Sequence, residues 1–189
     1  MNHPALACLI TLLFGFTAGA GAARAQTVID THTPLRERDV IFVPTHEEAA
    51  AVMMRLAGVT KSDVVYDLGC GDGALVIAAA KLGARAVGID IDPKRIAEAT
   101  VNVRAAGVQD RVTLIRGDIF DATLTIRDAT VVTLYLLQTL NERLAPRLKR
   151  ELTPGTRVVS HAFTMGDSWP PEKTEPVGRD VFAYLWTIR

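Results

Sequence analysis

A short apolar segment runs directly into a glycine-rich turn, and this junction constrains the fold more than any other feature of the chain. Val64 to Leu68 predicts a buried strand, and Gly69 to Gly73 predicts a tight turn. Ala74 to Leu82 then predicts a helix that is closed by Gly83. A strand, a turn and a helix in this order form the first half of a unit that builds a parallel sheet.

The rest of the chain continues the alternation of strands and helices. Strands are predicted at Ala86–Ile91, Val112–Ile115, Ala129–Leu137 and Arg157–Phe163, followed by an antiparallel hairpin of Lys173–Val177 and Val181–Ile188. Helices are predicted from a Thr45/Glu48 capping box to Gly58, from Asp92 to Gly107, and from Leu140 to Leu152 with a break or kink at Pro146. We therefore expect an α/β fold with a doubly wound, mostly parallel sheet and helices on both of its faces.

Charge and cysteine content exclude several classes of function. Lys plus Arg and Asp plus Glu each number 21, so the net charge is zero and a nucleic-acid partner is not expected. The two cysteines are Cys8, in the extreme N-terminal segment, and Cys70, so the folded part can form no internal disulfide. The histidines do not have the spacing of a metal site, and no metal is predicted.

We expect the N-terminal 25 residues to lie outside the folded domain. Residues 5–23 carry no charge, and small residues follow the apolar core, ending at Ala25. This pattern fits a signal peptide that is cleaved after Ala25 for export to the periplasm. It equally fits a retained membrane anchor with the domain on the cytoplasmic side, because basic residues follow the apolar run and none precedes it. A wrongly assigned start codon is a third explanation. We expect residues 26–42 to be a linker or arm and 43–189 to form the domain.

The glycine turn and an acid about 20 residues later suggest two classes of cofactor. Gly69, Gly71 and Ala74 satisfy the dinucleotide pattern G-x-G-x-x-A. However, a pyrophosphate would meet the carboxylates of Asp67 and Asp72 in the same turn. A cofactor that carries positive charge reverses this argument. S-adenosylmethionine (SAM) has a sulfonium and an ammonium group, and it is the cofactor that we predict.

Each acidic strand end has an expected part in holding SAM. Asp67 would lie near the positive charge, and the glycines would let the backbone approach the methionine portion. Asp90 would accept hydrogen bonds from both ribose hydroxyls. Asp118 would accept from the adenine amino group, with Ile119 packing on the ring. The full set of predicted cofactor-binding residues is Thr45, Asp67, Gly69, Gly71, Asp90, Ile91, Asp118 and Ile119.

Three of these stretches resemble the successive motifs of class I SAM-dependent methyltransferases. They are VVYDLGCGDGALVIAAA, VGIDIDP and GDIF. The resemblance implies a seven-stranded Rossmann-like sheet with an antiparallel last strand. It also carries Asp67, Gly69, Gly71, Asp90 and Asp118 over as cofactor-binding positions.

Other stretches resemble one branch of that superfamily. They are FVPTHEEAAAVMMRLAGV, VVTLYLLQTLNERLAPRLKREL, PGTRVVSHAFTMGDSWPPEKTE and AYLWTI. The branch is the small protein-lysine methyltransferases typified by the ATP synthase c-subunit and adenine nucleotide translocase lysine methyltransferases, with their bacterial relatives. The resemblance implies an N-terminal hydrophobic segment, which residues 5–23 supply, and places Thr45 and Glu48 over the cofactor. His46 departs from the pattern, where an apolar residue or proline is expected.

The substrate side is predicted less sharply than the cofactor side. A lysine amine, with a pKa of about 10.4, must lose its proton before it can accept a methyl group. Tyr135 and Thr133, at the end of the fourth predicted strand, and Glu48 are the candidate catalytic residues. Tyr135 would orient the amine, although a core tyrosine is an equal alternative. The function predicted is methylation of a lysine amine in a protein substrate, with membrane proteins among the candidate substrates. The alternatives are a small-molecule methyltransferase and a non-catalytic exported SAM-binding protein.

Three further expectations concern residues outside this set. His161 is expected to be a hydrogen-bonded core histidine, and Trp169 to anchor a loop. The basic residues of the last helix are expected to form a solvated face; they are Arg143, Arg147, Lys149 and Arg150.

Overall fold

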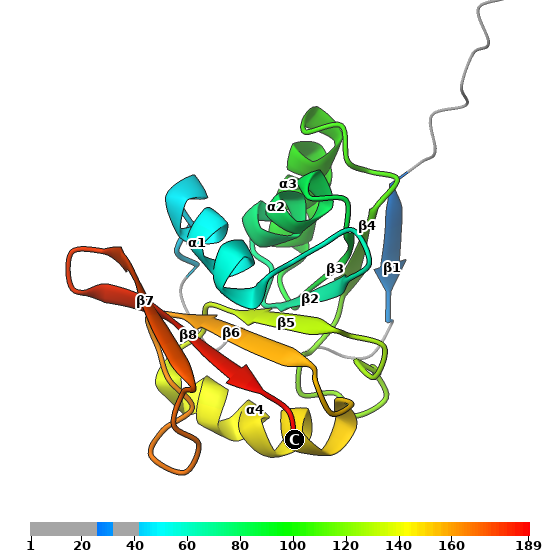
Figure 1. Cartoon of the computed structure of the whole chain (residues 1–189). Coiled ribbons are helices and arrows are strands. Elements are labelled where there is room, and N and C mark those ends of the chain that lie inside the picture. The colour runs from blue at the N-terminus through cyan, green and yellow to red at the C-terminus, as the bar shows by residue number, and fades with distance from the viewer. Residues whose placement is uncertain (1–25, 32–41) are drawn as a thin grey trace, which may run out of the picture.

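The computed structural model describes residues 26–31 and 42–189, which form an eight-stranded mixed sheet flanked by helices (Figure 1). The elements are β1 (Thr27–Asp30), α1 (Glu47–Ala57), β2 (Val64–Leu68), α2 (Ala74–Lys81), β3 (Arg85–Asp90), α3 (Pro93–Ala105), β4 (Val112–Arg116), β5 (Val131–Leu134), α4 (Gln138–Glu151), β6 (Arg157–His161), β7 (Lys173–Gly178) and β8 (Val181–Thr187).

The strand order β1-β4-β3-β2-β5-β6-β8-β7 creates one switch point. All pairs from β1 to β6 are parallel, and β8 joins β6 and β7 antiparallel, which confirms the predicted sheet and its C-terminal hairpin. From β2 the chain moves outward through β3 and β4, and then returns to the other side of β2 with β5 and β6. The crevice above the carboxyl ends of β2 and β5 is where such sheets bind ligands.

Helices cover both faces of the sheet, as expected (Figure 1). One buried cluster includes Met53 of α1, Ala79 of α2 and Val103 of α3. The other includes Leu144 and Leu148 of α4. The sheet is therefore the middle of three layers, and its central strands are buried on both sides. This explains why the apolar runs identified these strands correctly.

The strand β1 lies in the segment expected to be a linker. Its four residues are all exposed, and it joins the sheet through backbone pairing with β4, from Thr27 opposite Thr113 to Asp30 opposite Arg116. The Gln26 side-chain amide also donates to the Val112 carbonyl at 2.6 Å. Because no β1 side chain is buried, the segment shows no apolar periodicity, and the sheet has one strand more than the predicted seven.

The helix α1 begins differently from the prediction. Its N-cap is His46, no side chain caps it, and the Thr45/Glu48 capping box is therefore wrong. Glu47 and Glu48 instead lie in the first turn, where their negative charges stabilise the helix by interacting with the positive end of its dipole. The other end is as predicted, because Gly58 closes the helix with a left-handed conformation (φ 60°).

The helix α4 continues through Pro146, so of the predicted break or kink the break is wrong. Proline removes one backbone hydrogen bond inside a helix, at a cost of about 3 kcal/mol. Leu144, Ala145 and Leu148 flank the proline and are buried against the sheet. Their burial holds the helix on both sides of the interruption.

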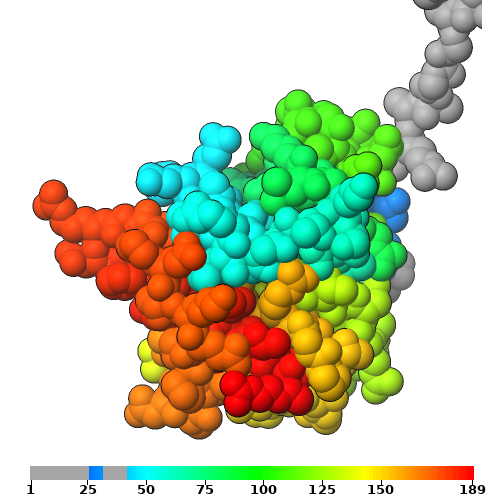
Figure 2. All heavy atoms as spheres, viewed as in Figure 1, coloured from blue at the N-terminus to red at the C-terminus, as the bar shows by residue number. Residues whose placement is uncertain are grey.

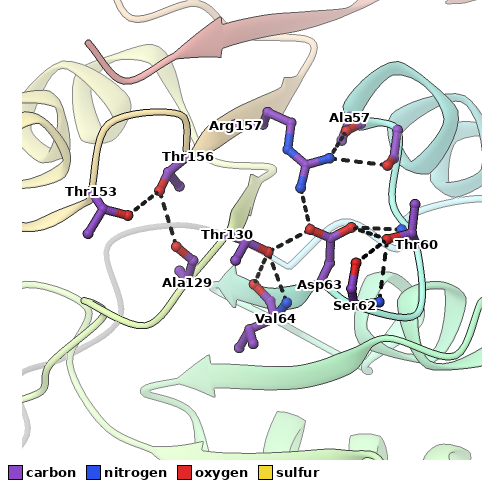
Figure 3. Close-up of polar contacts among 11 residues, drawn as sticks. Ala57, Thr60, Ser62, Asp63, Val64, Ala129, Thr130, Thr153, Thr156 and Arg157 are labelled. Atoms are coloured by element: carbon purple, nitrogen blue, oxygen red, sulfur yellow. Dashed lines mark hydrogen bonds and ion pairs between the residues drawn. The ribbon is translucent and has the colours of Figure 1, made fainter.

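A polar network joins the amino ends of three strands, opposite the crevice (Figure 3). Asp63, just before β2, accepts hydrogen bonds from the Thr60 backbone at 2.7 Å and the Thr130 hydroxyl at 2.7 Å. It is also paired with Arg157 of β6, which donates to the carbonyl oxygens of Ala57 and Gly58 at 2.7 and 3.1 Å. The network therefore fastens the end of α1 to the sheet.

The C-terminal hairpin packs beside α1. Figure 2 shows the surfaces of α1 and the hairpin side by side, and Arg55 of α1 pairs with Glu175 of β7 at 3.1 Å. Among residues 26–31 and 42–189, no helix combines the length and apolar character needed to span a bilayer. The signal-peptide and anchor predictions concern residues 1–25, which lie outside the described residues.

Candidate active site

Backbone geometry builds the glycine turn at the carboxyl end of β2. Gly69 and Gly71 have φ angles of 88° and 52°, which residues with side chains rarely adopt. The backbone amides of Gly69 and Cys70 donate to the Ile89 carbonyl at 2.8 and 2.9 Å, which fastens the turn to β3. A Cβ atom at Gly71 would lie 2.3 Å from the Phe42 ring, so only glycine fits beneath this aromatic cover.

Asp90, at the end of β3, holds the same turn by its carboxylate. One carboxylate oxygen accepts from the Gly71 backbone amide at 2.8 Å and the other from the Asp92 amide at 2.9 Å. Burial raises the pKa of Asp90, and these two hydrogen bonds oppose the shift. Each carboxylate oxygen has two lone pairs, so both can still accept from a ligand hydroxyl. The geometry therefore agrees with the predicted contact to ribose.

Asp67 lies beneath the turn and is almost completely buried. Its side chain accepts a hydrogen bond from the Thr133 hydroxyl at 2.8 Å. Burial raises the pKa of Asp67 to about 7. The hydrogen bond from Thr133 lowers this pKa, whereas the nearby carboxylates of Asp90 and Asp72 raise it further. A positive group in the cavity would favour the ionised form of Asp67.

The loop after β4 completes the cofactor side. Asp118 and Ile119 line the cavity, and the Asp118 carboxylate accepts from the Phe120 backbone amide at 2.9 Å. Arg147 of α4 donates to the Ile119 carbonyl at 2.5 Å and to the Leu124 carbonyl. Arg147 is buried, so the expectation of a solvated position is wrong for this residue. It anchors the loop, which the pattern of basic residues on the helix did not indicate.

A single cavity gathers all eight predicted cofactor-binding residues. Those that line it are Thr45, Asp67, Gly69, Gly71, Asp90, Ile91, Asp118 and Ile119. Phe42 and Arg95 also line it, and the Arg95 guanidinium lies 4.4 Å from the centre of the Phe42 ring. The cavity thus combines carboxylates, a close backbone approach and an apolar cover, which fits a ligand with positive charge, hydroxyl groups and a flat ring.

The candidate catalytic residues are dispersed. Tyr135 lines the cavity. Thr133 is fully buried and donates to Asp67, so it orients a carboxyl group on the cofactor side. Glu48 is exposed on α1 and does not line the cavity. Of the three, the structure places only Tyr135 where a methyl acceptor can reach it.

Tyr135 has an aromatic neighbour that sequence reasoning undervalued. The ring of His161, at the end of β6, lies 4.2 Å from the Tyr135 ring between centroids, at an interplanar angle of 55°. Both ring nitrogens of His161 are buried and have no hydrogen-bond partner among the described residues. The expectation of a hydrogen-bonded core histidine is therefore wrong. Trp169, by contrast, anchors its loop as expected, because its carbonyl accepts from the Trp186 indole at 2.8 Å.

The described residues contain no group of three His, Cys, Asp or Glu side chains that could hold a metal ion. Cys70 is buried in the glycine turn, and burial raises the pKa of its thiol well above the ordinary value. The thiol is therefore neutral and packs in the turn rather than acting as a nucleophile.

Comparison with known proteins identifies the family. A model of the ANTKMT methyltransferase domain matches residues 67–173, which include the glycine turn and the ends of β3 to β6. The chain belongs to the ANTKMT methyltransferase family. The chain is also 44% identical over 154 residues to a protein-lysine N-methyltransferase from Saccharolobus islandicus, and the alignment covers 79% of this chain and 94% of that protein.

Two further comparisons support the ANTKMT assignment. The adenine nucleotide translocase lysine N-methyltransferase of Mus musculus is 35% identical over 122 residues, which cover 64% of this chain and 52% of that protein. A solved structure described as an RNA methyltransferase from Salinibacter ruber is 49% identical with a TM-score of 0.73, and covers 77% of this chain and 94% of that one. That structure contains S-adenosyl-L-homocysteine (SAH). The predicted family, the methyltransferase activity and the SAM cofactor are thus confirmed.

Proposed function

We propose that this methyltransferase transfers a methyl group to the side-chain amine of lysine in a protein substrate. The observation that carries the proposal is the 44% identity to a protein-lysine N-methyltransferase along 94% of its length. The alignment runs along almost the whole of this relative, so it includes the acceptor side as well as the cofactor side. The family match likewise includes Tyr135 and His161.

The chain's own residues account for the main requirements of the reaction. SAM, when bound, supplies a methyl group on a positively charged sulfur. Asp67, Asp90 and Asp118 line the β2–β3–β4 half of the crevice and would hold the cofactor there. Tyr135 stands on the β5 half, where its hydroxyl can orient an amine and its ring face can stabilise positive charge. Catalysis here rests on aligning the amine lone pair in a cavity that excludes water.

We further propose that the substrate lies in a membrane. Residues 5–23 carry no charge and, if retained, would tether the enzyme to a bilayer, with its domain on the side where SAM is available. Tethering raises the effective concentration of membrane targets, so a small domain can be selective without a separate docking module. A relative named for a translocase is consistent with such a target.

Labelled SAM tests the proposed substrate class directly. The purified enzyme is incubated with an extract of its source cells that has been separated into membrane and soluble fractions. We expect label in membrane protein, released as methyl-lysine on acid hydrolysis, and no label when the extract's lysines have been acetylated beforehand. Label that ribonuclease removes would favour RNA as the substrate, and label confined to small metabolites would favour a small-molecule methyltransferase.

Tyr135→Phe tests the orienting role of the hydroxyl. We expect turnover to fall about tenfold or more while SAH affinity measured by calorimetry stays nearly unchanged, because only alignment of the acceptor is lost. Tyr184→Phe on β8 is the matched control and should leave both unchanged. Unchanged turnover in Tyr135→Phe would show that the hydroxyl does not orient the amine and that Tyr135 serves only as a core residue.

A further inference from the structure

The end of β6 carries a buried polar group that the proposed mechanism has not used. β5 and β6 are parallel, with Leu134 opposite Ser160, so Tyr135, which follows β5, and His161, the last residue of β6, lie side by side at the carboxyl edge of the sheet. Tyr135 lines the cavity, and His161 packs against its ring. The cofactor-binding carboxylates come from the other half of the crevice, so His161 belongs to the acceptor half.

Hydrogen bonds on both sides of His161 fix the position of its imidazole. The amide of Asn141 donates to the Ser160 hydroxyl at 3.0 Å and to the Phe163 and Thr164 carbonyls at 3.2 and 3.3 Å, on both sides of His161. Ala162, the next residue, has a φ of 65°, which is costly for a residue with a side chain. The fold thus maintains strain at the point where it places this histidine.

Burying an imidazole without hydrogen bonds destabilises a protein, whereas a phenyl ring of similar shape does not. His161 is 7% exposed, and neither ring nitrogen has a partner among the described residues. A buried and unpartnered polar group next to a strained residue, at the acceptor side of a cavity, is best explained by a partner that arrives with the substrate.

The surroundings keep this imidazole neutral. Burial lowers the pKa of His161, and His46, which precedes α1, lowers it further. Tyr135 is the titratable group in ring contact with it from the segment after β5. A neutral imidazole has one nitrogen that can accept a proton.

We infer that His161 is the proton acceptor for the lysine amine. This inference rests on the proposed function. The N–H bond of the lysine ammonium breaks, its electron pair stays on the amine nitrogen, and the proton forms a new N–H bond on the free imidazole nitrogen. The resulting imidazolium later releases the proton to water. Both ring nitrogens are covered in this structure, so a neighbouring side chain must move before the amine can reach them.

The inference predicts a specific pH profile. In the wild-type enzyme, methylation of lysine should rise with pH only through the lowered pKa of His161, below 6.5, and should then be level to about pH 9. Without His161, the amine must arrive already deprotonated from solution. The rate should then rise about tenfold per pH unit up to pH 9, because the pKa of a free lysine amine is about 10.4.

The test compares the wild type with His161→Phe, which keeps an aromatic partner for Tyr135, and with His161→Gln, which keeps polarity but cannot titrate. Initial rates of label transfer from SAM to lysine are measured from pH 5.5 to 9.5 on one source-cell protein extract. At pH 7 we expect both variants to be about 100-fold slower or more. SAH affinity should be unchanged, and the melting temperature of His161→Phe should equal or exceed that of the wild type.

Two further readouts do not depend on those variants. His46→Gln removes the neighbour that lowers the pKa of His161, so the acid limb of the wild-type profile should move to higher pH. In the cofactor-free wild type, the NMR signal of His161 should titrate below pH 6.5. Failure of the limb to move with His46→Gln, or an NMR titration above pH 7, would overturn the inference.

The inference and the proposed function fail in different ways. A wild-type enzyme that labels no lysine removes the proposed function, and the proton-acceptor role falls with it. If the wild type labels lysine and both His161 variants keep its rate and level pH profile, the proposed function stands and only His161 loses its role. A large fall in melting temperature together with lost SAH binding in both variants would mark His161 as structural.

Discussion

Asp67 shows how a single buried carboxyl group can serve cofactor binding at the expense of stability. Its pKa rises from 3.8 to about 7 on burial, so the folded state favours the protonated form. The stability that this gives is complete below about pH 4 and is lost as the pH rises through 7. Over about three pKa units, the loss reaches on the order of 4 kcal/mol.

Asp67→Asn should therefore raise the melting temperature of the cofactor-free protein at pH 8 and have little effect at pH 4. The asparagine carbonyl can still accept the Thr133 hydrogen bond. Thermal melts across this pH range measure the difference, and Asp110→Asn, at an exposed position, is the control. A difference that does not change with pH would contradict the raised pKa.

At the same scale, Asp90→Ala should weaken SAH binding by about 1.5–3 kcal/mol, or roughly ten- to a hundredfold. The substitution removes the acceptor for ribose and also frees the backbone amides of Gly71 and Asp92. Calorimetry with SAH measures the loss. Neither the wild type nor Asp90→Ala should prefer NAD to SAH in the same measurement. Equal SAH affinity of Asp90→Ala and the wild type would remove the ribose assignment.

At the scale of elements, the two edges of the sheet have separate tasks. The carboxyl edge holds the cavity, and the amino edge holds the Asp63–Arg157 network that joins α1, β2, β5 and β6 (Figure 3). Burial alone would raise the pKa of Asp63, but hydrogen bonds from Thr130 and Thr60 and the charge of Arg157 outweigh it and lower the pKa. This contribution to stability is present above about pH 4 and is lost as the pH falls through the lowered pKa.

Arg157→Ala should lower the free energy of unfolding by about 2–4 kcal/mol at pH 7, because it leaves Asp63 partly buried without its counter-charge. SAH affinity of the folded variant should not change. Denaturant unfolding measures the effect. Arg85→Ala is the matched control, since its pair with Asp128 is exposed on both sides and should be worth less than about 1 kcal/mol. Equal effects of the two substitutions would show that the network adds no stability.

At the scale of the whole molecule, the switch point between β2 and β5 divides the crevice into two halves. The predicted cofactor-binding acids lie at or just after the ends of β2, β3 and β4, while Tyr135 follows β5 and His161 ends β6. Methyl donor and acceptor thus meet where the two halves of the sheet adjoin. The hairpin β7–β8 extends the acceptor half and contacts α1.

The N-terminus of the native protein tests whether residues 5–23 are retained or cleaved. If they are a retained anchor, mass spectrometry of the native protein should find an uncleaved N-terminus in the membrane fraction. The apolar run and the basic residues after it lead us to expect this result. A mature chain that begins at Gln26 in a periplasmic fraction would rule out the anchor and support export.

The sequence alone determined the central sheet, the glycine turn and the acids that end β2, β3 and β4. These features follow from local rules: buried strands need apolar runs, a tight turn needs glycine, and parallel strands bring their carboxyl ends to one edge. The residues that line the cavity could therefore be predicted from the sequence, including Asp67, Asp90 and Asp118.

Only the tertiary structure decided the features that depend on what packs against a residue. β1 is held by backbone pairing alone, and Arg147 is buried by a loop from elsewhere in the chain. His161 lies on an apolar strand like any core residue, and only its neighbours show that its nitrogens lack partners. Side-chain contacts between distant segments leave no periodic trace in a sequence, so the acceptor side had to be found in the folded molecule.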